Sequence, residues 1–201
     1  MTKIVAITLL WVVTSLAGPA AAATLGLTTG LPQLEAADAE VDYVEFGPRG
    51  SLLTFGAVID TAQGVSPSGL AEIGFAIGFR TDDPVGTAMG FFFVDDEDGL
   101  FLDGLLTAVG FTEDVIELQF DSLAGPVASL FGPSVLMVID FDAPLGPNPF
   151  AALTSGSTYE VSVRLAKVVP DTPAPIPVPA ALPLLGFALL GLGGFARRRR
   201  I

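Results

Sequence analysis

The sequence predicts an all-β body, an antiparallel β-sandwich of jelly-roll type, preceded by an N-terminal signal helix and followed by a C-terminal transmembrane helix. Three observations support this fold class. Several segments alternate large apolar residues with small or polar ones, as strands with one buried face do. Gly, Pro, Asp and Ser separate these segments. The 23 glycines and 15 phenylalanines, with few lysines and arginines, also favour strands and turns over long surface helices.

Residues 1–23 have the features of a secretory signal peptide. Lys3 supplies a positive start, and residues 4–17 form an apolar stretch of the length typical of a signal rather than of a membrane-spanning helix. Ala21 and Ala23 have the small-residue spacing that signal peptidase accepts. We therefore predict cleavage after Ala23, with cleavage after Ala22 and an uncleaved anchor as the alternatives.

The body, residues 24–170, is long enough for one domain with a single core. Alternation predicts about eight short strands, at residues 41–46, 51–60, 73–79, 90–94, 100–102, 116–121, 135–141 and 159–165. The first of these is expected at an edge of a sheet. Residues 135–141 are apolar on both faces, which predicts a central strand. One or two helical turns are expected at residues 148–153, opened by Pro149.

The charge distribution and the missing residue types exclude several classes of function. All 22 acidic residues lie between Glu35 and Asp171, where only four basic residues occur, so this span carries 4 − 22 = −18. Such a body repels phosphate backbones, which argues against nucleic-acid binding. The sequence contains no Cys and no His, which excludes disulfides, thiolate sites, the usual zinc sites and Ser-His-Asp catalysis. No nucleophile motif is present either, so we expect a protein that is not an enzyme.

The C-terminal end combines three segments. Residues 171–179 contain four prolines and form a stiff, extended linker. Residues 180–196 carry no charge, and as a helix they would span about 25 Å, enough to cross a thinned bilayer. A basic tail, residues 197–201, follows and contains Arg197, Arg198, Arg199 and Arg200. These arginines would stop transfer and remain in the cytoplasm. The pattern predicts an inner-membrane anchor, with a buried core helix as the alternative.

This tail resembles a VPLPA-CTERM sorting domain, a relative of the PEP-CTERM tails. The resemblance rests on a Pro motif, an apolar stretch and an arginine cluster, in that order, over residues 176–201. The motif itself consists of Ile176, Pro177, Val178, Pro179 and Ala180, with Ile and Val where the family motif has its first Val and its Leu. The resemblance implies recognition by an exosortase-type membrane peptidase, which cuts near the Pro motif and passes the protein on to the cell surface.

One dense charge cluster is a candidate site. It consists of Asp95, Asp96, Glu97 and Asp98. The cluster lies between two predicted strands, so we expect a hairpin tip in which Gly99 adopts a positive φ. Four neighbouring carboxylates repel one another, and Ca²⁺ would relieve that repulsion, although the spacing does not match an EF-hand loop. A solvated turn and a calcium site both remain open. No other cofactor is expected.

Two acidic pairs and the aromatic residues bear on carbohydrate chemistry. Asp82 and Asp83 are better explained by a turn, and Asp140 and Asp142 by the end of a strand, than by the facing acids of a glycosidase. Residues 24–170 contain no Trp, and Phe in alternating strands indicates core packing. Sugar binding through Asp and Asn side chains remains open.

Together these features predict an exported, non-enzymatic surface or extracellular-matrix protein that is sorted through its tail. It would be anchored in the inner membrane before processing, and would then lie at the cell surface or outside the cell. The alternative is a calcium-dependent carbohydrate-binding module, with an extracellular polysaccharide as its partner.

Overall fold

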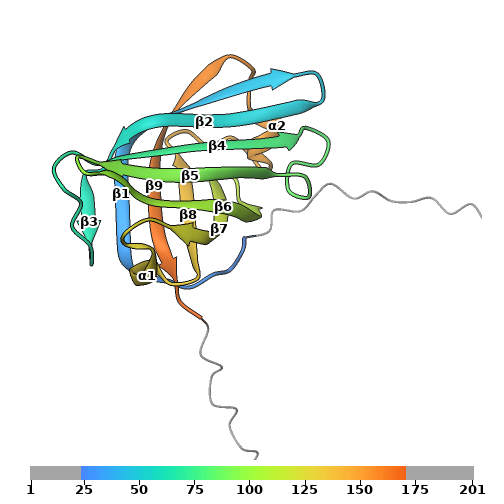
Figure 1. Ribbon diagram of the computed structural model, residues 1–201. Coiled ribbons are helices and arrows are strands. Elements are labelled where there is room, and N and C mark those ends of the chain that lie inside the picture. The colour runs from blue at the N-terminus through green and yellow to red at the C-terminus, as the bar shows by residue number, and fades with distance from the viewer. Residues whose placement is uncertain (1–23, 171–201) are drawn as a thin grey trace, which may run out of the picture. The chain divides into compact units, whose positions relative to one another are not determined.

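The computed structural model describes residues 24–170, and these residues form a closed antiparallel β-barrel (Figure 1). Its eight strands are β1 (Thr29–Phe46), β2 (Arg49–Val58), β4 (Glu72–Arg80), β5 (Met89–Asp96), β6 (Gly99–Phe111), β7 (Val115–Ala124), β8 (Ser134–Phe141) and β9 (Ser157–Val168). They follow one another around the barrel in chain order, and β9 pairs with β1. A short additional strand, β3 (Thr61–Gln63), pairs with β1 from outside this circle.

The predicted all-β class is confirmed, and the predicted sandwich is wrong. Closure depends on β1, which pairs with β9 along most of its length and with β2 near its end. At Tyr43 the two ladders coincide, because this residue lies opposite Leu52 on one side and Ser157 on the other. Register shifts between Ala36 and Ala39 of β1, and others in β2 and β6, mark irregularities of the kind that bend strands around a barrel.

Most predicted strands lie within observed ones. The segments at 73–79, 116–121, 135–141 and 159–165 belong to β4, β7, β8 and β9. Strand β8 is buried on both faces over most of its length, as predicted for a central strand. The expected helical turn is present as α2 (Pro149–Ala152). The predicted edge strand at 41–46 is instead the last part of β1. Asp42 and Tyr43 have a partner on each side, whereas residues 44–46 pair with β2 alone.

The interior of the barrel is filled with side chains. Phe75, Phe92 and Phe120 are completely buried, and the rings of Phe92 and Phe120 meet edge to face at 4.8 Å. Two short helices near opposite ends of β9 each add one aromatic ring: α1 (Ala128–Phe131) contributes Phe131, and α2 contributes Phe150. An eight-stranded barrel is just wide enough for side chains to fill it. The chemistry that this barrel can offer a partner therefore lies on its outer surface.

The described residues contain no helix that is long and apolar enough to cross a membrane. The predicted signal peptide (1–23), linker (171–179), transmembrane helix (180–196) and basic tail (197–201) lie outside the described residues.

Candidate interaction surface

The acidic cluster Asp95, Asp96, Glu97 and Asp98 lies where the sequence predicts it, at the hairpin between β5 and β6, and we call it the acidic hairpin. Asp96 lies opposite Gly99, whose φ is +107°. Both oxygens of the Asp96 carboxylate accept backbone N–H groups, one from Ser68 and one from Asp98, each at 2.9 Å. The hydroxyl of Ser68 donates to the Asp98 carboxylate at 2.6 Å. These carboxylates therefore fasten the hairpin to the loop before β4.

The same loop comes close to the third acidic residue, Glu97. The backbone N–H of Glu97 donates to the carbonyl of Ser68 at 3.1 Å. At Gly69, which has a φ of +59°, an added Cβ would lie only 2.0 Å from Cδ of Glu97. Among residues 24–170, no three acidic side chains are arranged so that they could hold a metal ion. The calcium site stays a prediction, while the geometry gives Asp96 and Asp98 a structural role.

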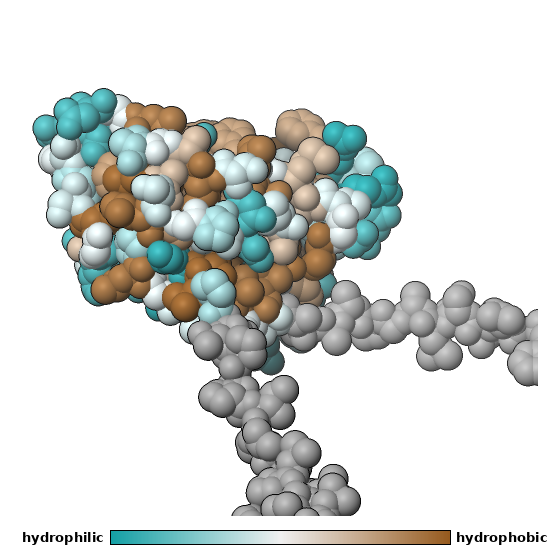
Figure 2. Space-filling view, turned by 60° about the horizontal axis from the view of Figure 1, so that its bottom comes forward, coloured by the Kyte–Doolittle hydropathy of each residue, from teal (hydrophilic) through white to brown (hydrophobic). Residues whose placement is uncertain are grey.

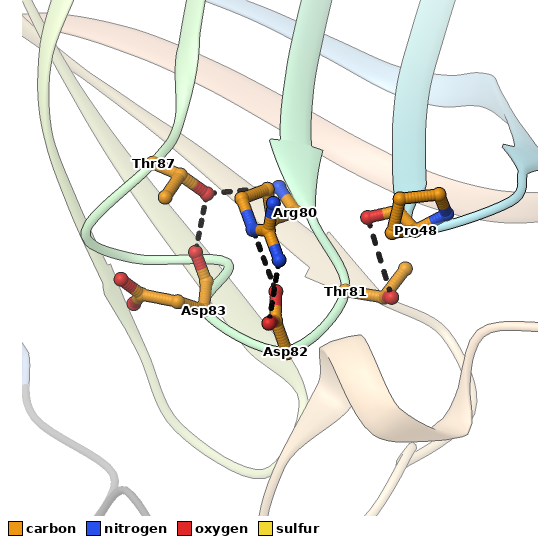
Figure 3. A network of polar contacts seen from close by, with 6 residues as sticks. All are labelled: Pro48, Arg80, Thr81, Asp82, Asp83 and Thr87. Atoms are coloured by element: carbon orange, nitrogen blue, oxygen red, sulfur yellow. Dashed lines mark hydrogen bonds and ion pairs between the residues drawn. The ribbon is translucent and has the colours of Figure 1, made fainter.

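Asp82 and Asp83 lie in the turn between β4 and β5, as predicted (Figure 3). Arg80 binds Asp82 through two hydrogen bonds, from Nε to Oδ1 at 2.9 Å and from Nη2 to Oδ2 at 2.8 Å. This guanidinium holds the pKa of the Asp82 carboxyl below its ordinary value. Asp83 accepts the backbone N–H of Gly86 at 2.9 Å, and Thr87 accepts the backbone N–H of Arg80 at 2.8 Å. Both carboxylates thus serve the turn.

A shallow acidic depression of about 270 Å³ lies between β1 and β9. Its carboxylates come from Asp38 and Glu40 of β1, from Glu160 of β9, and from Asp142, which follows the end of β8. Glu40 and Glu160 lie directly opposite each other across the ladder, an arrangement that repels. The prediction that Asp140 and Asp142 mark the end of a strand is confirmed, because β8 ends at Phe141.

A continuous apolar area covers the outside of β2, β4, β5 and β6, and we call it the outer apolar face. It consists of Leu53, Phe55, Ala76, Met89, Phe91, Phe93 and Leu105. One cross-strand row runs through its centre, with Leu53 opposite Ala76, Ala76 opposite Phe91, and Phe91 opposite Leu105. Four members are well exposed: Met89 at 72%, Phe55 at 69%, Leu105 at 57% and Phe91 at 46%. Hydrophobic areas also interrupt the polar surface in the view of Figure 2.

Small residues on β4 let the aromatic rings of β5 lie across the sheet. The Phe93 ring covers Gly74, where an added Cβ would lie only 2.2 Å from Cζ of Phe93. The rings of Phe91 and Phe93 stack at a centroid distance of 6.5 Å and an angle of 27°. Phe92, between them, points into the core and is completely buried. The expectation that phenylalanines in alternating strands form the core is therefore wrong for Phe91 and Phe93.

Charged groups border the outer apolar face on several sides. The central row ends in Asp42 beyond Leu53 and in Asp121 beyond Leu105. Asp103 lies opposite Phe93, and its buried Oδ1 accepts no hydrogen bond from any described residue. Beyond Met89, a depression of about 240 Å³ contains Arg49 and Arg80, which lie opposite each other in the ladder between β2 and β4. The frame is thus acidic along the sides and basic at one end.

Two features of the sequence indicate the outer apolar face, although the predicted core packing of phenylalanine does not include it. Three consecutive phenylalanines, Phe91, Phe92 and Phe93, cannot all point inward from a strand, because successive side chains alternate. The small residues Gly74, Ala76 and Gly78 also recur with period two on β4.

The residues predicted for sorting and cleavage lie outside the described residues: Ala21, Ala23, Ile176, Pro177, Val178, Pro179, Ala180, Arg197, Arg198, Arg199 and Arg200. Comparison of the chain with known protein families, with curated proteins and with solved structures finds no match. The surface chemistry of the barrel and the sequence patterns at the two ends therefore carry the functional argument.

Proposed function

We propose that the protein is an exported, non-enzymatic component of the cell surface or extracellular matrix that is sorted through its C-terminal tail. We propose further that its barrel binds a partner through its outer surface. The observation that carries the second half of this proposal is the filled interior. Phe75, Phe92 and Phe120 occupy the space in which a barrel could otherwise enclose a ligand. The surface depressions around the acidic groups and around Arg80, at about 270 and 240 Å³, are smaller than typical small-molecule sites.

The first half of the proposal is supported by the two ends of the sequence. The Ala21 and Ala23 spacing fits signal cleavage, and the order of Pro motif, apolar stretch and arginines fits an exosortase substrate. The strongly acidic body is compatible with export, because its net negative charge opposes association between copies. The absence of His and Cys from the sequence supports a role without catalysis.

The sorting proposal is tested by replacing Arg197, Arg198, Arg199 and Arg200 together with Ala in the full chain. Pulling an arginine into hydrocarbon is costly, so the parent tail stays in the cytoplasm and the variant tail does not. The variant should reach the periplasm but remain unprocessed and absent from the surface fraction. Replacing the same four residues with Lys keeps the charge and is the matched control for retention. Normal processing and surface localisation of the Ala variant would contradict the proposal.

A further inference from the structure

We propose that the outer apolar face is the docking site for a polypeptide partner whose contact surface is apolar at its centre and basic along its sides. This inference goes beyond the proposed function and does not depend on export or sorting. It rests on the composition of the face and on the charges around it.

The composition of the face matches the core of a protein–protein interface. Such cores are enriched in Phe and Met, and they are surrounded by a polar rim. Here Phe91, Phe93 and Met89 lie on one strand, with Leu105 beside them on β6. A soluble domain rarely leaves so continuous an apolar area without an interaction that covers it. The strands β4, β5 and β6 beneath the face each have a hydrogen-bonded neighbour on both sides, and β2 pairs with β1 as far as Leu53.

The acidic sides of the rim determine the charge of the partner there, whereas Arg49 and Arg80 border one end of the face. Asp42 and Asp121 end the central row on its two sides, and Glu72 lies opposite Asp95 at the end near the acidic hairpin. Cationic side chains of a partner would reach these carboxylates while its apolar residues cover the rings of Phe91 and Phe93. Such complementarity accelerates association and selects the partner.

Asp103 adds a further carboxylate beside the apolar centre. It lies opposite Phe93, and the residue is partly exposed, although its Oδ1 is buried. A Lys or Arg side chain at the edge of the apolar contact would pair with the exposed part of this carboxylate. The partner is therefore expected to place a cationic donor next to its apolar centre.

The same charges argue against a second copy of this chain as the partner. Residues 24–170 contain 21 acidic and four basic residues, so this part carries 4 − 21 = −17. Two outer apolar faces in contact would bring Asp42 and Asp121 of both copies close together. Anionic lipid surfaces are repelled for the same reason. A neutral polysaccharide would leave the acidic rim without counter-charges.

The test measures binding of a defined probe to the full chain, held in nanodiscs of zwitterionic lipid, with empty nanodiscs as the blank. The probe is a short synthetic peptide of alternating leucine and lysine, and its control has glutamate in place of lysine. Phe91→Ser and Leu105→Ser should each weaken binding of the lysine peptide by about tenfold or more, as loss of a central contact does. The matched control is Phe46→Ser, because Phe46 is 80% exposed and lies outside the outer apolar face.

A second pair of variants tests whether binding depends on the acidic rim. Asp121→Asn should weaken binding of the lysine peptide by about threefold at low salt and by less at high salt. Glu113→Gln removes the same charge from an exposed loop residue away from the face and should have a smaller effect.

Three results would overturn the proposal. The first is equal binding of the lysine peptide to the Phe46→Ser and Phe91→Ser variants. The second is a concentration-dependent dimer, seen in sedimentation, that Phe91→Ser abolishes, because the occupant would then be a second copy. The third is binding of a neutral polysaccharide that Phe91→Ser abolishes. Each of these leaves the sorting proposal untouched, since sorting is measured by localisation of the chain.

Discussion

The hydroxyl of Thr54 on β2 donates a hydrogen bond of 2.6 Å to the carbonyl of Glu40 on β1, just beyond the last backbone pair of these two strands. The backbone ladder between β1 and β2 extends only from Phe46 to Asp42. Past that point, side chains connect the two segments, together with one backbone hydrogen bond from the N–H of Asp60 to the carbonyl of Glu35 at 2.9 Å. Asp60 continues the connection, because its carboxylate accepts the backbone N–H of Ala37 at 2.8 Å. Thr54 therefore completes the closure of the barrel.

We expect Thr54→Val to lower the free energy of unfolding by about 1–2 kcal/mol, because the carbonyl of Glu40 loses its donor at a site where Thr54 is only 4% exposed. Thr107→Val is the matched control, since the hydroxyl of Thr107 donates to the carbonyl of Gln119 at 3.2 Å in an exposed position. Urea denaturation of the full chain measures both variants. Equal losses of unfolding free energy in the two variants would show that the Thr54 hydrogen bond does not stabilise the barrel more than an exposed one does.

Neighbouring phenylalanines on β5 should respond very differently to truncation. Phe92→Ala removes a fully buried ring that contacts Phe120 and should cost about 3–5 kcal/mol of stability. Phe91→Ala removes an outward ring and should cost less than about 1 kcal/mol. Thermal unfolding of the two variants measures the difference. A larger loss of stability for Phe91→Ala than for Phe92→Ala would show that Phe91, and not Phe92, packs in the core.

The acidic hairpin should depend on Asp96 more than on its neighbours. Asp96→Ala leaves the backbone N–H groups of Ser68 and Asp98 without their acceptor, and we expect a loss of about 1–2 kcal/mol. Glu97→Ala removes an exposed carboxylate and should change stability by less than about 0.5 kcal/mol. Hydrogen exchange at the amide of Ser68 gives a local measurement, and unchanged protection there in Asp96→Ala would contradict the anchoring role.

Calcium should stabilise the protein no more than sodium does at matched ionic strength. The carboxylates of Asp96 and Asp98 already accept hydrogen bonds from the protein, and salt of any kind screens repulsion within so acidic a body. Thermal midpoints in the two salts provide the comparison. A rise specific to Ca²⁺ that Asp98→Asn abolishes would instead support the calcium-dependent alternative.

The sequence predicts the faces of strands better than it predicts how the strands close. In the segment 73–79, strict alternation assigns Ile73, Phe75 and Ile77 to the interior, and all three are buried. A sandwich and a barrel share that pattern, because each buries one face of every strand. What distinguishes them is the pairing of Tyr43 with both Leu52 and Ser157, a relationship between distant segments that periodicity does not contain.

Strands β1 and β6 are longer than the sequence pattern predicts, for a related reason. Residues 29–40 are rich in alanine and acidic residues, which have weak strand propensity, yet they form most of β1 because β9 pairs along them. In β6, Gly104 and Gly110 interrupt the apolar pattern, while β5 and β7 supply partners on both sides. Tertiary pairing overrides local preference in both strands. The outer apolar face was missed because phenylalanine was assigned to the core by residue type alone.

The most direct test of the account is the covalent form of the protein recovered from the surface of cells that express the full chain. N-terminal sequencing and intact mass together define both ends. The account predicts a chain that begins at Thr24, after cleavage at Ala23, and that ends near residues 176–180, without the apolar stretch and the arginines. Surface material that begins at Met1 and ends at Ile201 would contradict it.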